Sequence, residues 1–292
     1  DSHGQLGDGG SNTDTTAPSS TAIDLGTGRT AVAVSAGSRH TCAILDNGDA
    51  KCWGQDSYGQ LGDGGSNTDT NAPSSTAIDL GTGRTAVAVS AGWSHTCAIL
   101  DNGDLKCWGR DNFGQLGDGG SNTDTNAPSS TAIDLGSGRT AIAVSAGDYH
   151  TCAILDNGDA KCWGKDSHGQ LGDGGSNTDT TAPSSTAIDL GTGRTAVAVS
   201  AGSRHTCAIL DNGDAKCWGQ DSYGQLGDGG SNTDTNAPSS TAIDLGTGRT
   251  AVAVSAGWYH NCAILDNGDA KCWGQDSHGQ LGDGGSNTDT TA

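Results

Sequence analysis

The chain has 292 residues, of which only 32% are hydrophobic and 49 are glycine, so it lacks the apolar content for one large core. Its formal charge is −20, and all 34 acidic residues are aspartate, which favours turns over helices. We therefore expect an all-β protein built from strands and turns. An acidic surface repels phosphates, which argues against nucleic acid as a partner. No apolar run is long enough to span a membrane.

One 55-residue unit is repeated along the chain. The segment DSHGQLGDGG begins at Asp1 and returns, with small changes, at Asp56, Asp111, Asp166, Asp221 and Asp276. Units 1–55, 56–110, 111–165, 166–220 and 221–275 are followed by residues 276–292, which match residues 1–17 letter for letter. We interpret residues 1–292 as a single repeat array. The partial unit predicts an open end, with the array continuing in a longer chain or through end-to-end contact with another copy.

Within the first unit, residues 7–20 form a loop rich in Gly, Ser, Thr, Asn and Asp. The alternating segments 21–25 and 30–34 predict two strands joined by a Gly-Thr-Gly turn. Segments 41–45 and 49–53 predict two more strands on either side of Asp46-Asn47-Gly48. Four short strands per unit are typical of a propeller blade. We expect four-stranded blades in a β-propeller or in an open propeller-like superhelical array. A β-solenoid is the less favoured alternative.

The loop carries two further features. Asp8, Asn12 and Asp14 offer three oxygen ligands of the kind that Ca²⁺ prefers, but the loop lacks the alternating Asp order and the closing Glu of a calcium loop. An ordinary solvated loop is the favoured interpretation, and we assign no metal and no cofactor. The Thr/Ser run at 13–21, around Pro18, is similar to O-glycosylated stalk sequence.

The cysteines predict a hairpin closed by a disulfide. A three-residue Asp46-Asn47-Gly48 loop with Gly48 at positive φ places Cys42 opposite Cys52, whereas a two-residue Asn-Gly turn would separate the cysteines. All ten cysteines share this spacing, which favours the first register and five bridges over a metal site or free thiols. Disulfides require an oxidising compartment, so we expect an extracellular or cell-surface protein. The pairs are Cys42 and Cys52, Cys97 and Cys107, Cys152 and Cys162, Cys207 and Cys217, and Cys262 and Cys272.

The same stretch resembles a known repeat. His40-Thr41-Cys42-Ala43-Ile44-Leu45, Asn47-Gly48, Trp53-Gly54 and Gly59-Gln60-Leu61-Gly62 are similar to the repeat of the regulator of chromosome condensation family, in a bacterial-type form with paired cysteines. The resemblance recurs once per unit and implies a β-propeller of four-stranded blades, usually seven to a ring. Members include a chromatin-binding exchange factor, a plant ultraviolet receptor and a bacterial β-lactamase inhibitor, so function does not follow from the fold. The acidic charge argues against the chromatin role.

Differences between the units point to a contact surface. Aromatic and basic residues occur at a few variable positions just before and just after the hairpin, so in a blade they should gather on one rim. Such residues are typical of contact surfaces, here for a glycan, a protein or a neighbouring propeller; the alternative is drift at tolerant positions. The set comprises Arg39, Tyr58, Trp93, Arg110, Phe113, Tyr149, Lys165, Arg204, Tyr223, Trp258 and Tyr259.

No residue pattern predicts catalysis. His40 and its four copies recur once per unit, and a residue copied five times is expected to be structural, with its imidazole bonded to a loop backbone. No phosphate-binding loop occurs between a strand and a helix. We therefore expect a non-catalytic extracellular repeat protein that self-associates into a fibre or surface array. The alternative is a discrete propeller that acts as a lectin-like or protein-binding module.

Overall fold

A computed structural model describes residues 1–10, 13–230, 232–285 and 288–290. The described residues form five antiparallel sheets of three strands each, one per unit, and we call each sheet a blade. The strands are β1 (Ala31–Ala36), β2 (His40–Leu45) and β3 (Ala50–Gly54) in blade 1; β4 (Ala86–Ala91), β5 (His95–Leu100) and β6 (Leu105–Gly109) in blade 2; β7 (Ala141–Ala146), β8 (His150–Leu155) and β9 (Ala160–Gly164) in blade 3; β10 (Ala196–Ala201), β11 (His205–Leu210) and β12 (Ala215–Gly219) in blade 4; and β13 (Ala251–Ala256), β14 (His260–Leu265) and β15 (Ala270–Gly274) in blade 5.

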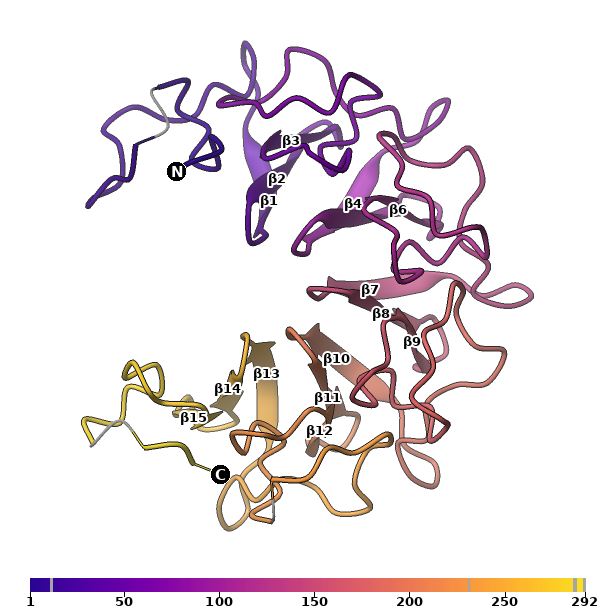
Figure 1. Cartoon of the computed structure of the whole chain (residues 1–292), viewed down its shortest axis with the longest axis vertical. Coiled ribbons are helices and arrows are strands. Elements are labelled where there is room, and N and C mark those ends of the chain that lie inside the picture. Colours follow the sequence, from indigo (N-terminus) through magenta and orange to yellow (C-terminus); the bar gives the residue numbers. More distant parts are fainter. Residues whose placement is uncertain (11–12, 231, 286–287, 291–292) are drawn as a thin grey trace.

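The blades are arranged around a common centre in an open arc (Figure 1). The first strand of each blade lies nearest the centre and the third lies farthest out (Figure 1). Both ends of the chain lie on the side where the arc is open (Figure 1). The propeller-type arrangement agrees with the expected architecture, and it takes the open form.

The predicted hairpin register is confirmed. Cys42 is paired with Cys52 and Ile44 with Ala50 across β2 and β3, which leaves a three-residue loop between the strands. The Leu45 N–H donates to Asp49 and the Gly48 N–H donates to Leu45, both at 2.8 Å. Gly48 has a φ of 81°, a conformation that side chains with a Cβ adopt rarely. All ten cysteines form the five predicted disulfides.

The prediction of a fourth strand at residues 21–25 is wrong. In the second unit, the equivalent segment 76–80 lies along the outer edge of β3, but only the Ile78 N–H reaches it, donating to the Ala50 carbonyl at 2.9 Å. A second isolated contact joins Gly54 and Thr70. The segment then turns, because the Asp79 carboxylate accepts a hydrogen bond from Gly81. Its alternating apolar side chains serve packing and not a hydrogen-bonded ladder, since Ile78 and Leu80 are buried.

The outer edge of blades 1 to 4 is therefore covered by the next unit along the chain. The hydrophobic core lies in the same way between consecutive blades. One cluster joins Ile44 and Cys52 of the first unit to Leu61, Leu80 and Trp108 of the second, and three equivalent clusters follow along the array. Small apolar clusters repeated in this way bury enough surface without one large core. This is how a chain with so few hydrophobic residues folds.

The faces at the two ends of the arc are less covered than those inside it. Leu6 is 41% exposed whereas its copy Leu61 is 2% exposed, and Ile264 is 49% exposed whereas its copy Ile209 is 1% exposed. Within the described residues, no helix has the length and apolar character that crossing a membrane requires.

Candidate functional site

The chain topology places four variable positions at the same end of every blade. In blade 1 these are Ser38 and Arg39, in the loop between β1 and β2, and Gln55, directly after β3. Gly54 at the end of β3 is paired with His40 at the start of β2, so Gln55 lies beside that loop. The fourth position comes shortly after Gln55 in the sequence and is occupied by Tyr58. Its copy in the first unit is His3. We call this end of the array the variable face. The opposite end, which carries the Asp-Asn-Gly turns, is the turn face.

In the third unit, three variable side chains contact one another. The rings of Phe113 and Tyr149 lie with their centroids 5.4 Å apart, almost perpendicular. The Lys165 Nζ atom lies 4.5 Å from the centre of the Phe113 ring and 4.9 Å from that of Tyr149. Lys165 therefore makes cation–π contacts with both rings. Burial among these side chains, and then the neighbouring positive charge of Arg204, lower the pKa of Lys165.

The second and fifth units add further aromatic and basic side chains to the variable face. The Arg110 guanidinium lies 4.7 Å from the centre of the Tyr58 ring and 5.8 Å from that of Tyr149. In the fifth unit, the rings of Tyr223 and Tyr259 lie 5.1 Å apart. Aromatic and basic side chains that are far apart in sequence thus lie side by side on the variable face.

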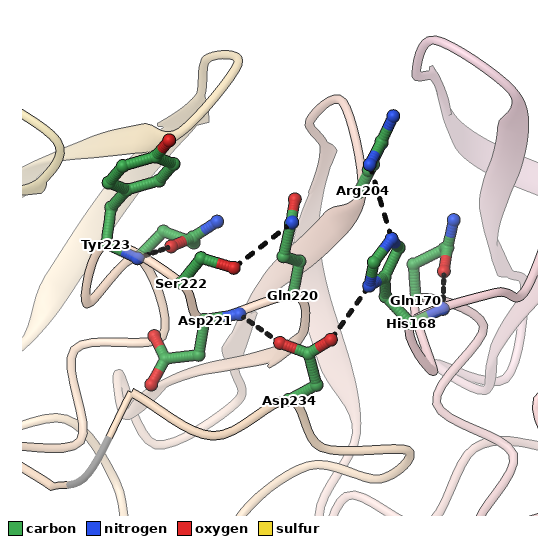
Figure 2. Close-up of polar contacts among 9 residues, drawn as sticks. His168, Gln170, Arg204, Gln220, Asp221, Ser222, Tyr223 and Asp234 are labelled. Atoms are coloured by element: carbon green, nitrogen blue, oxygen red, sulfur yellow. Dashed lines mark hydrogen bonds and ion pairs between the residues drawn. The ribbon is translucent and has the colours of Figure 1, made fainter.

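The fourth unit has a polar contact chain at the same place (Figure 2). The Asp234 carboxylate bonds His168 Nδ1 at 2.8 Å, and His168 Nε2 lies 3.4 Å from Arg204 Nη1. Asp234 also accepts a hydrogen bond from the Asp221 N–H at 2.9 Å (Figure 2). The Arg204 side chain points away from the blade beyond His168 (Figure 2). Arg204 is therefore held by a histidine, with no carboxylate in direct contact among the described residues.

At the centre of the array, the first loops of four blades converge. Trp93 of blade 2 lies 4.8 Å from Tyr149 and 6.3 Å from Trp258 of blade 5, measured between ring centroids. Between them, Ser203 donates a hydrogen bond of 2.6 Å to the Asp148 carboxylate. Burial raises the pKa of Asp148, against the opposing effect of that hydrogen bond. Trp93, Asp148, Ser203 and Trp258, together with the first loop of blade 1, line a cavity of about 260 Å³ at the centre of the face.

The remaining variable residue, Arg39, is exposed on blade 1 and contacts none of the aromatic residues of the cluster. The three calcium candidates do not form a site in the described part of the chain. Asp8 bonds the N–H of Gly10, Asp14 bonds the amino terminus, and Asn12 lies outside the described residues. No group of three or more His, Cys or Asp side chains is placed to hold a metal within the described ranges.

The recurring histidines bond differently from the prediction. His40 Nε2 bonds the Thr96 hydroxyl of the next blade at 2.8 Å, and not a loop backbone. That hydroxyl donates its own proton to the Gln60 carbonyl, so the imidazole must be the donor. His40, His95, His150 and His205 each link consecutive blades in this way. Burial lowers the pKa of His40 to about 4. The sequence signal was the His-Thr pair that recurs in four of the five complete units, because the histidine of one unit bonds the threonine of the next.

Comparison with known proteins agrees with this architecture. The family model described as RCC1-like domain matches residues 1–292. The human E3 ubiquitin-protein ligase HERC2 is 30% identical over 256 residues, which are 88% of this chain and 5% of that protein. The ultraviolet-B receptor UVR8 of Arabidopsis thaliana is 31% identical over 251 residues, which are 86% of this chain and 54% of that protein. The chain thus spans at most about half the length of these relatives.

Two solved structures share the fold. Human WBSCR16 has a TM-score of 0.77 at 23% identity, over 90% of this chain and 66% of that one. Yeast RCC1 (Prp20), in its structure bound to Kap60, has a TM-score of 0.75 at 19% identity, over 91% of this chain and 60% of that one. The family model, the repeated Trp-Gly and Gly-Gln-Leu-Gly motifs and the blades therefore lead to one assignment. This chain belongs to the RCC1-like domain family.

Proposed function

We propose that this chain is a non-catalytic binding module that holds a protein partner on its variable face. One observation carries the proposal. The units are nearly identical, and the four positions at which they differ strongly in chemistry all lie on this face. In the first and second units these positions hold His3 and Tyr58, Ser38 and Trp93, Arg39 and Ser94, and Gln55 and Arg110. The constant residues build the blades, and the variable residues on one surface can contact a partner without affecting the fold.

The chemistry of the face supports the same proposal. Trp, Tyr and Arg are the residues that most often dominate the binding energy of protein interfaces. Here they are partly exposed and hold one another in place through ring and cation–π contacts, which lowers the entropy lost on binding. One solved structure of the yeast relative is a complex with Kap60, and a second is associated with binding to Gsp1p and histones. These protein partners support a protein ligand in place of a glycan.

We further propose that the module works in an oxidising compartment, outside the cell or at its surface. Each blade carries a disulfide across β2 and β3 or their equivalents, and in blades 1 to 4 this disulfide is buried. Disulfides persist in such compartments and are reduced in the cytosol. The ligase and receptor activities of HERC2 and UVR8 belong to much longer proteins, so we do not carry them over to this chain.

The test compares two triple variants. Peptides are first selected for binding from a random display library, and their affinities are measured by fluorescence anisotropy. The variant Trp93→Ser, Tyr149→Ser and Trp258→Ser introduces a residue that other units carry at the same positions. The control variant Arg84→Ala, Arg139→Ala and Arg194→Ala changes the turn face. We expect about tenfold weaker binding, or more, for the first variant and no change for the control. Peptides that lose affinity only for the control would refute the proposal.

Self-association is a second candidate function. The uncovered end faces, with Leu6 and Ile264 exposed, favour it, because a further blade from any copy would cover them. A head-to-tail contact that does not close would give a filament. Light scattering over a hundredfold range of concentration should then show growing mass. A constant mass equal to one chain, 28.9 kDa, would exclude this candidate.

A further inference from the structure

Building on the proposed function, we propose that the partner is an acidic protein segment. Its carboxylates would lie beside Arg110, Lys165 and Arg204, and an apolar side chain would lie against Trp93 and Trp258. Charge complementarity at the variable face carries this inference, through four observations.

The first observation is where the basic residues are used. The chain has 14 Lys and Arg residues, and ten of them recur once per unit. The five recurring arginines each pair with an aspartate at the turn face, at 3.2 to 3.4 Å. Four of the five recurring lysines donate to a leucine carbonyl at 3.0 Å. The other four basic residues are Arg39, Arg110, Lys165 and Arg204, which all lie at variable positions.

The second observation is that these four cations lack carboxylate partners. None of them forms an ion pair with an aspartate in the described ranges, although the chain has 34 aspartates to offer. Arg110 and Lys165 lie over aromatic rings, and Arg204 contacts the ring of His168. In a chain of net charge −20, cations left unpaired on one face are available to an external anion.

The third observation is that three of these cations, Arg110, Lys165 and Arg204, are close to one another. Arg110 and Lys165 both contact the Tyr149 ring, at 5.8 and 4.9 Å. The positive charges of Arg204 and Arg110 each contribute to the lowered pKa of Lys165. An incoming carboxylate would relieve this repulsion. The flat guanidinium of Arg110, fixed over Tyr58, is well suited to hold a carboxylate with two hydrogen bonds.

The fourth observation favours a short acidic segment over a polyanion. DNA, RNA and sulfated glycans carry charge along their whole length, and the surrounding aspartates would repel them beyond the patch. Aspartates also limit the patch itself: Asp148 lies at its centre, Asp234 holds His168, and the negative charge of Asp179 partly opposes the lowering of the Lys165 pKa. A protein segment can place a few carboxylates on the patch and uncharged residues elsewhere. The exposed Trp258 and the partly buried Trp93 give it an apolar contact.

The experiment uses fluorescein-labelled 16-residue peptides and the whole chain. The probe alternates Glu and Tyr, and two comparison probes are a Lys-Tyr peptide and a 16-nucleotide oligothymidine. The test variant is Arg110→Gln, Lys165→Gln and Arg204→Ser, which introduces only residues found at the same positions as Gln55 and Ser94. The control variant Arg84→Gln, Arg139→Gln and Arg194→Gln removes the same charge at the turn face.

We expect the Glu-Tyr peptide to bind the wild-type chain more tightly than both comparison probes, and more weakly as NaCl rises from 50 to 300 mM. The test variant should bind it about tenfold more weakly, and the control within about twofold. Failure of the Glu-Tyr peptide to bind, equal loss in both variants, or tighter binding of oligothymidine would overturn the inference. If library-selected peptides still depend on Trp93 and Trp258 in that case, the proposed function stands and only the acidic partner falls.

Discussion

His205 Nε2 lies 2.8 Å from Asn261 Oδ1, at a place where three other histidines meet a threonine hydroxyl. Asn261 also donates from Nδ2 to the Gln225 carbonyl, as the threonine hydroxyls donate to equivalent carbonyls. The asparagine thus reproduces both the accepting and the donating roles of threonine. This contact between blades 4 and 5 is buried, so its polarity matters for stability.

Replacing Asn261 tests this link. Asn261→Thr should leave the melting temperature nearly unchanged, because Thr occupies the position in every other complete unit. Asn261→Val should destabilise by about 1–3 kcal/mol, because it leaves the His205 N–H buried without a partner and removes one of the two donors to the Gln225 carbonyl, which keeps only the Trp273 indole N–H. Thermal unfolding followed by circular dichroism measures both. Equal losses for Thr and Val would show that the hydrogen bonds do not contribute.

The buried histidines make the array sensitive to acid. Burial lowers the pKa of His150 to about 3, whereas an unfolded histidine titrates near 6.5. Between these values the unfolded chain binds a proton that the folded chain does not, so stability falls as the pH falls through 6.5. For one histidine the loss reaches about 2 kcal/mol by pH 5. His150→Gln keeps an N–H donor but does not titrate. The variant should therefore lose less stability than wild type between pH 7.5 and 5, and an equal loss would contradict a buried neutral imidazole.

A buried aspartate should act in the opposite direction. Burial raises the pKa of Asp111 to about 6, above its usual value of 3.8, although its carboxylate accepts the Leu116 N–H. Between pH 6 and 3.8 the folded chain binds the extra proton, so this group adds stability as the pH falls. Asp111→Asn removes the titration. The stability of this variant relative to wild type should therefore drop by about 1 kcal/mol between pH 7.5 and 5, a figure that is reduced for solvent screening of the carboxylate. The difference in melting temperature between variant and wild type at the two pH values measures this drop. A constant difference would refute the raised pKa.

Local sequence was sufficient to predict the hairpins. The cysteine spacing, the Asp-Asn-Gly loop and the short alternating segments all act within about fifteen residues, and they define β2, β3 and their copies. The missing fourth strand depends on distant residues. Ile23 and Ile78 lie in identical local sequence, yet their packing depends on whether a preceding blade is present. A segment with alternating apolar residues can join a sheet as a hydrogen-bonded strand, or it can pack against the sheet edge without forming the hydrogen bonds of a strand. Periodicity alone does not distinguish these two cases.

The candidate site was predictable in composition and not in contacts. Comparison of near-identical units singled out residues such as Trp93, Tyr149 and Trp258, because the framework around them is constant. Their contacts depend on the curvature of the arc, which brings Trp93 of blade 2 to Trp258 of blade 5. That curvature arises from packing between blades, which no single unit encodes. The histidine links were missed for the same reason, since donor and acceptor come from different units.

Glycine in the hairpin turn offers a matched pair of substitutions. Gly158 and Gly268 are copies with φ of 82° and 86°, so an alanine at either position meets similar backbone strain. A Cβ at Gly158 would lie 2.5 Å from the Thr195 Cβ of the next unit, whereas a Cβ at Gly268 would have no neighbour within 4 Å. We expect Gly268→Ala to cost about 1 kcal/mol from strain alone. Gly158→Ala should cost clearly more, because the strand that follows must shift. Melting temperatures of the two variants measure the difference. Equal losses would mean that the contact between the turn and the next blade tolerates an added methyl group, and that backbone conformation alone requires glycine in this turn.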